Sequence, residues 1–570
     1  MKLTRFFTCV ALAAAPVSVP MAGVGVAVAQ PADFRAQADT ILNAAYPADG
    51  PGAAVIVMRR GRMIYSAGRG LADIGAHRRI TRDTVFRLGS LTKQFTAAVI
   101  LQLVAEGRIS LDDPISHFFP DYPQPGARAT VRQLLNHTSG IQSYTGIPGW
   151  MAGEGPARAH TTAELVALSS GRPSPTPPGQ AWAYNNSGYV MLGAIIEHVT
   201  GKSWHQVMAE RIFRPLGLRT IGYGVERESG AAMARGYSEE DGRVGPARSI
   251  HMSVPHAAGA LVGTVGDLAR WSQALHHGRV VRADLYRLMT SATALPDGHS
   301  QPYGFGLQME HLRGRDSLEH SGGIFGFSTY AAYVPSEEVF VAVLTNSDEA
   351  MTAPGIVSWR LAALAMGDPY PNLTRTEVDA ATLAPLLGVY RVDGGNSSRR
   401  FFARDGKLWT MREGGRELEV FAAGGDRFFY GPNSLTWFRI VRQADGIMAM
   451  EMHQDGAEAA ERAVRTGDIP PEPAAVAVSP AILQSYVGHY TTPGPPAADI
   501  ALGEDGRLTI TLTGERAIPM RPVSETEFIV ERVNARVVFH PESGRTNRFV
   551  IHQGERQLEA RRAPPAAPAS

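Results

Sequence analysis

The feature that most constrains this chain is a repeat in its last third, where two stretches share one pattern at a spacing of one hundred residues. The segment LLGVYR at 386–391 is echoed by YVGHYT at 486–491, and DGKL at 405–408 is echoed by DGRL at 505–508. Both copies consist of short alternating segments divided by turn residues, which is typical of an antiparallel barrel or sandwich. We therefore expect two small antiparallel β-barrels, at 378–466 and 480–562.

Proline-containing stretches at 367–377 and 467–480 separate these copies from each other and from the first part of the chain. In that first part, hairpins are predicted at 52–70 and 328–346. Between the hairpins, helices are predicted at 90–106, 130–136, 162–170, 187–200, 203–211, 265–277 and 282–290. This order predicts one α+β domain at 30–367, in which the first and last strands share a mixed sheet flanked by helices. Residues 563–570 are expected to form a disordered tail.

The first twenty-nine residues have the features of a secretory signal peptide. Lys2 and Arg5 precede an apolar run, and the run ends in the small residues AVA at 27–29, a suitable cleavage site. An uncleaved membrane anchor is the alternative, since about 20 apolar residues can span a bilayer, but two prolines in the run favour cleavage. We expect a secreted or periplasmic protein without a stable membrane span. Its single cysteine, Cys9, leaves with the signal, so no disulfide is expected.

The charged residues narrow the range of possible functions. Removing residues 1–29 changes the formal net charge from +1 to −1, a balance that argues against nucleic-acid binding. The chain contains only four lysines against fifty-one arginines, and these lysines are Lys2, Lys93, Lys202 and Lys407. Because lysine is so rare here, Lys93 calls for a role that arginine could not fill.

Lys93 lies in the predicted helix RLGSLTKQFTAAVILQLVAEGRI at 87–109, which is apolar on nearly every face and so belongs inside a domain. The first turn of this helix carries Ser90 and Lys93, polar groups that a buried helix end avoids unless they have a use. Residues i and i+3 share a helix face, so Lys93 can act as the general base for a nucleophilic Ser90. Arginine stays protonated and cannot serve as that base. The Ser-x-x-Lys spacing alone is weak evidence, because many surface helices contain it.

Two further motifs lie downstream. AWAYNNSGY places Tyr184 and Asn186 just before a predicted helix, and LEHSGGIFGFSTYAAYV places His320, Gly322 and Gly323 at the head of a predicted strand. In this order and at these separations, the three motifs resemble those of the serine β-lactamase and penicillin-binding protein superfamily. The phrases VRQLLNHTSGI, AGALVGTVGDLARW and PYGFGLQM are similar to the framework of its class C β-lactamase and D-aminopeptidase branch.

The resemblance implies a β-lactamase/transpeptidase-like domain that forms an acyl-enzyme on Ser90, with Lys93 as the base. It implies that Tyr184 relays protons and that His320 holds the polar end of the substrate. The oxyanion hole is then formed by backbone N–H groups of Ser90 and the third motif. The implied site residues are Ser90, Lys93 and Tyr184 for catalysis, and Asn186, His320, Gly322 and Gly323 for substrate binding.

His320 stands where true class C β-lactamases have lysine, in agreement with the D-aminopeptidase and esterase-like members. A catalytic domain followed by two lipocalin-like β units resembles the three-domain D-aminopeptidases, in which a loop of the last domain narrows the active site. The favoured function is an exported serine hydrolase of amides or esters, a D-aminopeptidase in particular, acting on small molecules or short peptides without metal or cofactor. A D,D-carboxypeptidase, an esterase and a non-catalytic cell-wall or small-ligand binding protein remain open, as do stereospecificity and oligomeric state.

Other motifs favour ordinary structural interpretations. The GKS at 201–203 has Ile196 where a phosphate-binding loop needs glycine. Neither of two histidine pairs has the spacing of a zinc site, and these pairs are His276 with His277 and His251 with His256. His137, in LLNHTSG, is expected to satisfy carbonyl groups of its loop.

Overall fold

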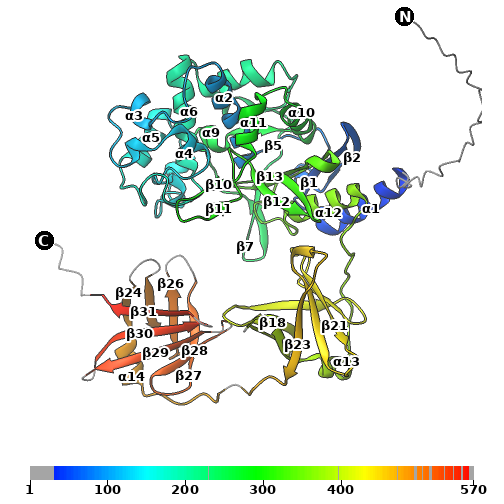
Figure 1. Ribbon diagram of the computed structural model, residues 1–570, viewed down its shortest axis with the longest axis vertical. Coiled ribbons are helices and arrows are strands. Elements are labelled where there is room, and N and C mark those ends of the chain that lie inside the picture. Colours follow the sequence, from blue (N-terminus) through cyan, green and yellow to red (C-terminus); the bar gives the residue numbers. More distant parts are fainter. Residues whose placement is uncertain are drawn as a thin grey trace, which may run out of the picture.

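The computed structural model describes residues 31–563, except for residues 229, 396, 472, 493–496, 504, 513–515, 532, 534, 543–544 and 554–555. A large domain of helices and one central sheet is followed by two separate β-barrels (Figure 1). The expected signal peptide at 1–29 and residues 564–570 of the expected tail lie outside the described residues. Within the part of the chain that is described, no helix is long and apolar enough to cross a membrane.

The large domain is built on a six-stranded sheet in the order β12-β13-β14-β15-β1-β2. Its strands are β1 (Ala53–Arg59), β2 (Arg62–Arg69), β12 (Gln308–Leu312), β13 (Arg315–Ile324), β14 (Phe327–Val334) and β15 (Val339–Thr345). The first and last hairpins share this sheet as predicted, because β1 pairs with β15 from Ala53 opposite Thr345 to Arg59 opposite Val339. A mixed sheet was expected, but all five pairings are antiparallel.

Helices cover both faces of this sheet. They are α1 (Pro31–Ala45), α2 (Thr92–Ala105), α3 (Ile115–Phe118), α4 (Val131–Leu135), α5 (Thr162–Ser170), α6 (Asn186–Thr200), α7 (Trp204–Met208), α8 (Gly224–Arg227), α9 (His256–Gly259), α10 (Val265–His276), α11 (Ala283–Met289) and α12 (Pro354–Met366). The predicted helix at 203–211 is α7 followed by a π-helical turn at Ala209–Phe213. Short strands complete the domain: β3 (Leu71–Asp73), β4 (Arg78–Arg79), β5 (Phe86–Arg87), β6 (Gly222–Tyr223), β7 (Tyr237–Glu240), β8 (Arg243–Pro246), β9 (Leu261–Gly263), β10 (Thr293–Ala294) and β11 (Ser300–Gln301).

Alternation along β1 explains how one sheet supports two cores. Ala54 and Ile56 pack into the core shared with α2 and α6, whereas Val55 and Val57 pack into the core shared with α1 and α12. Successive side chains of a strand point to opposite faces, so a strand that is apolar at every position is buried on both. Helix α2 is buried along nearly its whole length, which confirms the expectation from its apolar sequence.

The repeat forms two closed eight-stranded antiparallel barrels, which confirms the prediction of two small β-barrels. The first contains β16 (Gly388–Val392), β17 (Ser398–Arg404), β18 (Lys407–Arg412), β19 (Glu417–Ala422), β20 (Arg427–Phe429), β21 (Trp437–Arg442), β22 (Met448–His453) and β23 (Glu461–Gly467), after the short helix α13 (Ala380–Leu383). The second contains β24 (Gly488–Thr491), β25 (Ala498–Leu502), β26 (Leu508–Leu512), β27 (Ile518–Pro522), β28 (Glu527–Val530), β29 (Ala535–Glu542), β30 (Arg545–Gln553) and β31 (Arg556–Arg562), after α14 (Pro480–Tyr486).

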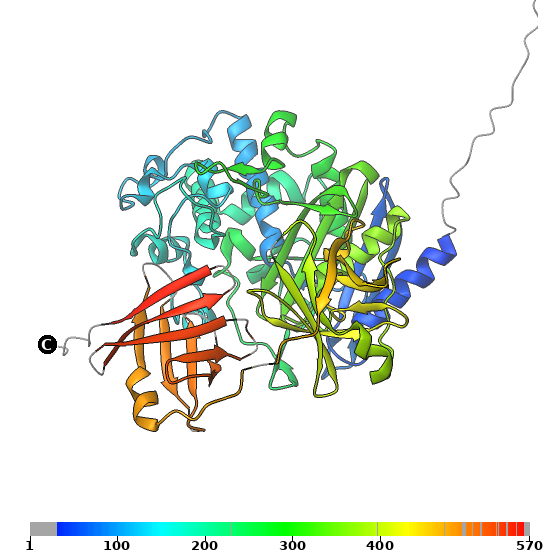
Figure 2. The ribbon, with the colours of Figure 1, turned by 60° about the horizontal axis from the view of Figure 1, so that its bottom comes forward.

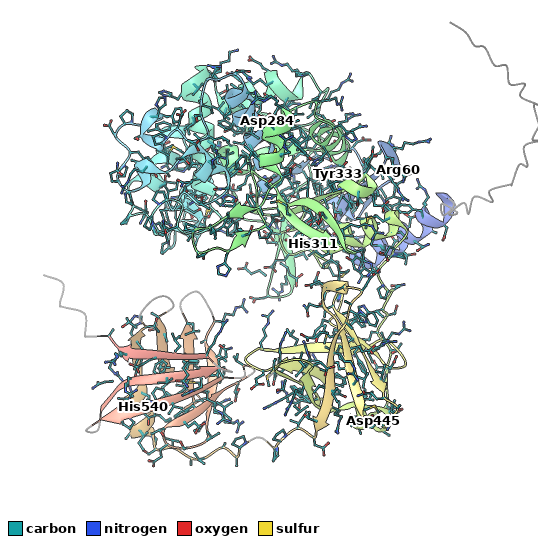
Figure 3. All side chains as sticks on the ribbon, in the orientation of Figure 1. Arg60, Asp284, His311, Tyr333, Asp445 and His540 are labelled. Carbon is teal, nitrogen blue, oxygen red and sulfur yellow. The ribbon has the colours of Figure 1, made fainter. Side chains whose placement is uncertain are left out.

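The first barrel is packed against the large domain. Leu435 of this barrel belongs to the same apolar cluster as α1 and α12, and Arg313 donates a hydrogen bond of 2.8 Å to the Gly456 carbonyl. Arg313 follows the edge strand β12, whose His311 lies at the lower margin of the large domain, toward the barrels (Figure 3). The two barrels lie side by side in both ribbon views (Figure 2), and Arg416 of the first bridges to Val533 of the second.

Candidate active site

Ser90 lies in a single helical turn, η1 (Gly89–Leu91), that leads directly into α2. The turn depends on Gly89, whose φ of +54° is in the left-handed region and whose Cα approaches β13 closely. A Cβ atom at position 89 would come within 3.0 Å of the backbone nitrogen of Gly323. The sequence therefore places Ser90 at the start of a buried helix and directly beside the strand of the third motif.

Lys93 is fully buried and its Nζ atom has three neighbours. Nζ lies 3.0 Å from Ser90 Oγ, 2.8 Å from Asn186 Oδ1 and 2.9 Å from the Ala258 carbonyl oxygen. No carboxylate is among these neighbours, and burial lowers the pKa of Lys93 well below its usual value. A neutral amine is therefore the favoured state of this side chain.

The same three contacts orient that amine. Asn186 Oδ1 and the Ala258 carbonyl can only accept hydrogen bonds, so they take the two protons of a neutral Lys93 amine. The lone pair of Nζ then faces Ser90 Oγ, the remaining neighbour. This geometry is what a general base needs in order to remove the serine proton.

The second motif holds its amide at the entrance of α6. Asn185 caps the helix by accepting a hydrogen bond of 2.9 Å from the Gly188 backbone N–H. Asn186, the first helical residue, donates from Nδ2 to Thr145 Oγ1 at 3.2 Å, which turns its Oδ1 toward Lys93. Of the two implied tasks for Asn186, binding the substrate amide or orienting Lys93, the observed contact is with Lys93.

Tyr184 lies against the lysine. Its ring centroid is 4.8 Å from Lys93 Nζ and 4.4 Å from the ring centroid of His137. Although 38 % of the residue is exposed, its hydroxyl group lies among crowded neighbours. Burial raises the pKa of this phenol, and a hydrogen bond with Ser90 opposes the rise. Tyr184 therefore remains protonated at neutral pH and is a proton donor rather than the initial base.

His320 is buried and both of its ring nitrogens are engaged. Nδ1 lies 2.6 Å from the Ser321 carbonyl, to which it can only donate, and Nε2 lies 2.9 Å from the Tyr303 hydroxyl, which donates to it. Burial, with a smaller contribution from Lys93, lowers the pKa of His320 to about 3. Both ring nitrogens are thus engaged by groups of the protein, and the contact of His320 with the polar end of a substrate stays a prediction.

Two residues that sequence reasoning did not place in the site complete the polar layer behind Tyr184. Tyr303, in the framework phrase PYGFGLQM, bonds His320 and packs on His137 with ring centroids 4.7 Å apart. His137 accepts a hydrogen bond of 3.1 Å from the Asn185 backbone N–H, so it does not serve loop carbonyls as expected. Its Nε2 atom is buried with no hydrogen-bond partner among the described residues. The framework phrases were the signal for both residues.

The glycines of the third motif allow β13 to approach the nucleophile. A Cβ atom at Gly322 would come within 2.3 Å of the Leu88 carbonyl and 3.2 Å of the Ser90 backbone nitrogen, so only glycine fits there. Gly323 is exposed and lines the cavity together with Ser90. The backbone N–H groups of Ser90 and Gly323 thus belong to adjacent segments, which an oxyanion hole made by both groups requires.

A cavity of about 320 Å³ opens in front of Ser90. Its walls are mostly apolar and include Tyr144, Ile250, Phe325 and Phe327. All described residues that line it belong to the large domain, and neither barrel contributes one. A cavity of this size and lining suits a small substrate with one bulky apolar group.

Asp348 is the one acidic or basic side chain among the described residues that line this cavity. Its Oδ2 atom accepts hydrogen bonds from Ser238 Oγ at 2.7 Å and from the Gly326 backbone N–H at 2.8 Å. Its Oδ1 atom is buried without a hydrogen-bond partner in the described structure. Sequence reasoning missed this residue, although an acidic group directly after the final apolar strand was a usable signal.

Comparison with known proteins agrees with this geometry. A family model described as Beta-lactamase matches residues 43–365, more than half of the chain. The chain belongs to the beta-lactamase family. Within this family it is 26% identical over 440 residues to penicillin-binding protein 4* of Bacillus subtilis (strain 168), covering 72% of this chain and 94% of that protein. It is 29% identical over 354 residues to a D-aminopeptidase of Gluconobacter oxydans (strain 621H), covering 60% of this chain and 63% of the relative.

This chain also aligns with solved structures that have a similar fold. The octameric penicillin-binding protein homologue from Pyrococcus abyssi aligns with a TM-score of 0.52 at 24% identity, covering 76% of this chain and 98% of that one. The D-amino acid amidase from Ochrobactrum anthropi SV3 aligns with a TM-score of 0.51 at 27% identity, covering 59% of this chain and 98% of the amidase chain. The match to the Gluconobacter D-aminopeptidase spans less than two thirds of that protein's length.

Proposed function

We propose that this protein is an exported serine hydrolase that cleaves amides of small amino-acid substrates with a free amine, as a D-aminopeptidase or amino-acid amidase does. The observation that carries this proposal is the fully buried Lys93, whose Nζ lies 3.0 Å from Ser90 Oγ and has no acidic neighbour. Such a lysine is a base at neutral pH, and a serine beside it is a nucleophile.

Acylation follows from the proposed roles of these contacts. Neutral Lys93 accepts the Ser90 proton as Oγ attacks the substrate carbonyl carbon, and the carbonyl oxygen becomes an oxyanion between the N–H groups of Ser90 and Gly323. When the C–N bond breaks, Tyr184 donates its proton to the leaving amine and regains one from protonated Lys93. The raised pKa of Tyr184 supports this assignment, since a phenol that stays protonated can donate at neutral pH.

Deacylation uses the same groups in reverse order. A water molecule loses a proton to the Tyr184 and Lys93 pair and attacks the ester carbon in the oxyanion hole. The ester bond to Ser90 Oγ breaks, the oxygen regains its proton from Lys93, and the free acid leaves. In this scheme Asn186 holds Lys93 in place through its 2.8 Å contact, and His320 supports the layer behind Tyr184.

The charges of the cavity favour an amine-bearing substrate over a carboxylate-bearing one. His320 is neutral where related enzymes have a cationic lysine, because its pKa is lowered to about 3. The only charged lining residue in the described structure is Asp348, which attracts a substrate ammonium and repels a carboxylate. These two observations favour a D-aminopeptidase-like activity over a D,D-carboxypeptidase, whose peptide substrate ends in a carboxylate.

One preparation of the mature chain tests the proposal. We expect a fluorophosphonate to add to Ser90, and we expect D-amino-acid p-nitroanilides with apolar side chains to be turned over faster than N-acetyl analogues, short acyl esters or a chromogenic cephalosporin. Intact-mass analysis with the Ser90→Ala variant as control locates the adduct. Labelling that persists in Ser90→Ala, or turnover of the cephalosporin alone, contradicts the proposal.

A further inference from the structure

A second cavity lies away from Ser90, where the large domain meets the first barrel. This junction cavity has a volume of about 550 Å³ and is lined by α1, by α12, by residues 369–375 and by the loop after β20. Ile41 and Ala44 of α1, Val357 and Leu364 of α12 and Phe429 of the barrel give it apolar walls. Because Leu435 and Tyr370 join the barrel to the same core, the cavity is part of a packed interface.

The charge of the junction cavity is one-sided. Its lining contains two arginines, Arg360 and Arg375, and no acidic residue among those described. Arg375 pairs with Glu377 at 3.5 Å and lies over the ring of Phe421 at 5.3 Å. Arg360 is partly buried and has no hydrogen bond, ion pair or aromatic contact with any described residue.

Three other arginines with limited exposure each have an acidic partner. Arg87 contacts Glu228 at 2.6 Å, Arg313 contacts Asp368 at 2.5 Å, and Arg399 contacts Glu461 at 3.0 Å. A buried charge without a partner is costly, which is why buried arginines are normally matched by a carboxylate or phosphate. Burial lowers the pKa of Arg360, which reflects the same cost. An anionic group from outside the chain would supply the missing partner.

Arg360 lies on the face of α12 that lines the junction cavity. Val357, Arg360 and Leu364 are three and four residues apart and so share one helix face. All three line the junction cavity. Nearby, the hydroxyl of Thr352 is buried with no hydrogen-bond partner in the described structure. One anionic head beside Arg360 and one apolar tail along α1 therefore match the lining.

We propose that the junction cavity binds an amphiphile with a single anionic head group on an acyl chain, held by Arg360. The head can be a carboxylate, as in a fatty acid, or a phosphate, as in a phospholipid, because guanidinium recognises both. The apolar walls accept the chain, and the volume is in the range of sites for small ligands. This site is separate from the Ser90 cavity, with which it shares no lining residue.

Isothermal titration calorimetry on the full mature chain tests the proposal with four defined ligands below their micelle concentrations. Dodecanoate and dodecyl phosphate carry anionic heads on one tail, dodecyltrimethylammonium carries a cationic head on the same tail, and butanoate carries the head with little tail. We expect saturable binding of one or both anionic amphiphiles, and at least tenfold weaker binding of the other two. Dodecanoate alone points to a fatty acid, and dodecyl phosphate alone points to a phospholipid head.

Variants locate the site. Arg360→Met keeps the length of the side chain without its charge and should weaken binding of the anionic amphiphile at least tenfold, whereas Arg360→Lys should retain most of it. Arg375→Gln is the matched control, since Arg375 already has an acidic partner, and should stay within about twofold. Equal binding of the cationic ligand, or undiminished binding by Arg360→Met, overturns the proposal. The comparison of ligands on the wild-type chain needs no variant, so the proposal stays testable if Arg360→Met does not fold.

Discussion

At the scale of single residues, the site depends on Lys93, one of only four lysines in an arginine-rich chain. Lys93 has two acceptors, Asn186 Oδ1 and the Ala258 carbonyl, and it is the third contact, with Ser90, that makes it useful. A permanently charged side chain in this position would donate to all three oxygens and leave the serine proton without a destination. The scarcity of lysine in this arginine-rich sequence is therefore consistent with a chemical requirement at position 93.

Replacing Lys93 by arginine tests this requirement. Lys93→Arg keeps most of the length of the side chain but stays protonated and cannot accept the serine proton, so kcat should fall at least about a thousandfold. Steady-state kinetics on the best p-nitroanilide measures the loss. Lys202→Arg is the control, because Lys202 is exposed and pairs with Glu210 at 2.8 Å. The kcat of this variant should equal that of the wild type. A Lys93→Arg enzyme that kept a tenth of the wild-type kcat would show that another group is the base.

Asp348 should decide between substrates with and without a free amine. Asp348→Asn preserves the size and the acceptor for the Gly326 N–H but removes the charge, so the preference for free-amine over N-acetyl substrates should fall about tenfold to a hundredfold. The ratio of the two kcat/KM values measures this preference. Glu349→Gln is the control, because Glu349 is exposed and does not line the cavity. An unchanged ratio in a labelled, active Asp348→Asn enzyme would falsify the role of Asp348 and leave the serine chemistry intact.

A histidine with a lowered pKa, His276, should make the stability of the protein depend on pH. Burial lowers the pKa of His276 to about 3, whereas an unfolded histidine titrates near its ordinary value of 6.5. Between these values the unfolded state binds the extra proton, so the free energy of unfolding falls as pH falls through this window. At pH 5 the loss is about 2 kcal/mol for His276 relative to neutral pH.

Thermal unfolding at pH 7.5 and pH 5 measures this loss. His276→Phe keeps the ring that stacks on Tyr333 at 4.1 Å and should lose about 2 kcal/mol less stability on acidification than the wild type. His299→Gln is the control, because His299 is exposed, whereas His277 contributes to the lowered pKa of His276. If the wild type and His276→Phe lose the same stability between pH 7.5 and pH 5, His276 does not gain a proton on unfolding in this pH range.

At the scale of elements, the repeat in the sequence corresponds to repeated contacts. The Tyr390 hydroxyl donates to the carbonyl of Leu386 at 2.5 Å, and the Tyr490 hydroxyl donates to that of Tyr486 at 2.8 Å. In each barrel this bond ties the first strand to the helical turn before it, so the two barrels share one closing contact. The second barrel adds a bond, because Arg562 donates to the Tyr490 hydroxyl at 2.8 Å.

Removing each tyrosine hydroxyl should therefore affect the two barrels unequally. Tyr390→Phe leaves one carbonyl unpaired and should cost the first barrel about 1 kcal/mol, whereas Tyr490→Phe also leaves Arg562 without that acceptor and should cost the second about 2 kcal/mol. Hydrogen–deuterium exchange of β16 and β24, followed by mass spectrometry, measures each barrel within the whole chain. Each variant serves as the control for the other barrel. A larger effect in β16 than in β24 would contradict this assignment.

The helices of the large domain show how much of the fold the sequence could predict. Periodicity located most helices of the large domain to within a residue or two, and the pattern of α2 correctly predicted its burial, since both depend on local apolar spacing. The engagement of His320 by Tyr303, and the position of Asp348 in the Ser90 cavity, depend on strands that are distant in sequence. No local pattern encodes such packing, so these contacts required the structure.

At the scale of the whole molecule, the two barrels differ in how they attach. The first shares an apolar cluster with α1 and α12, so its removal would expose core residues such as Tyr370. The second barrel is reached through residues 467–480, where the Pro473 carbonyl accepts a hydrogen bond of 2.5 Å from Arg521 and the Val476 N–H donates to the Pro522 carbonyl at 3.1 Å. That segment therefore contacts the second barrel at these two points, although most of its described residues are exposed.

This difference leads to a prediction for a chain that ends near residue 470. The described residues that line the Ser90 cavity all come from the large domain, so loss of the second barrel should leave Ser90 labelling intact. The ratio of kcat/KM for free-amine and N-acetyl substrates should also stay within about twofold of the full chain, because Asp348 and the apolar walls remain in place. The same ratio measured in Asp348→Asn shows that the assay can detect a change. If the shortened enzyme instead accepts N-acetyl substrates that the full chain rejects, the second barrel gates the cavity, as the resemblance to three-domain D-aminopeptidases implies, and substrate selection is shared between the two ends of the chain.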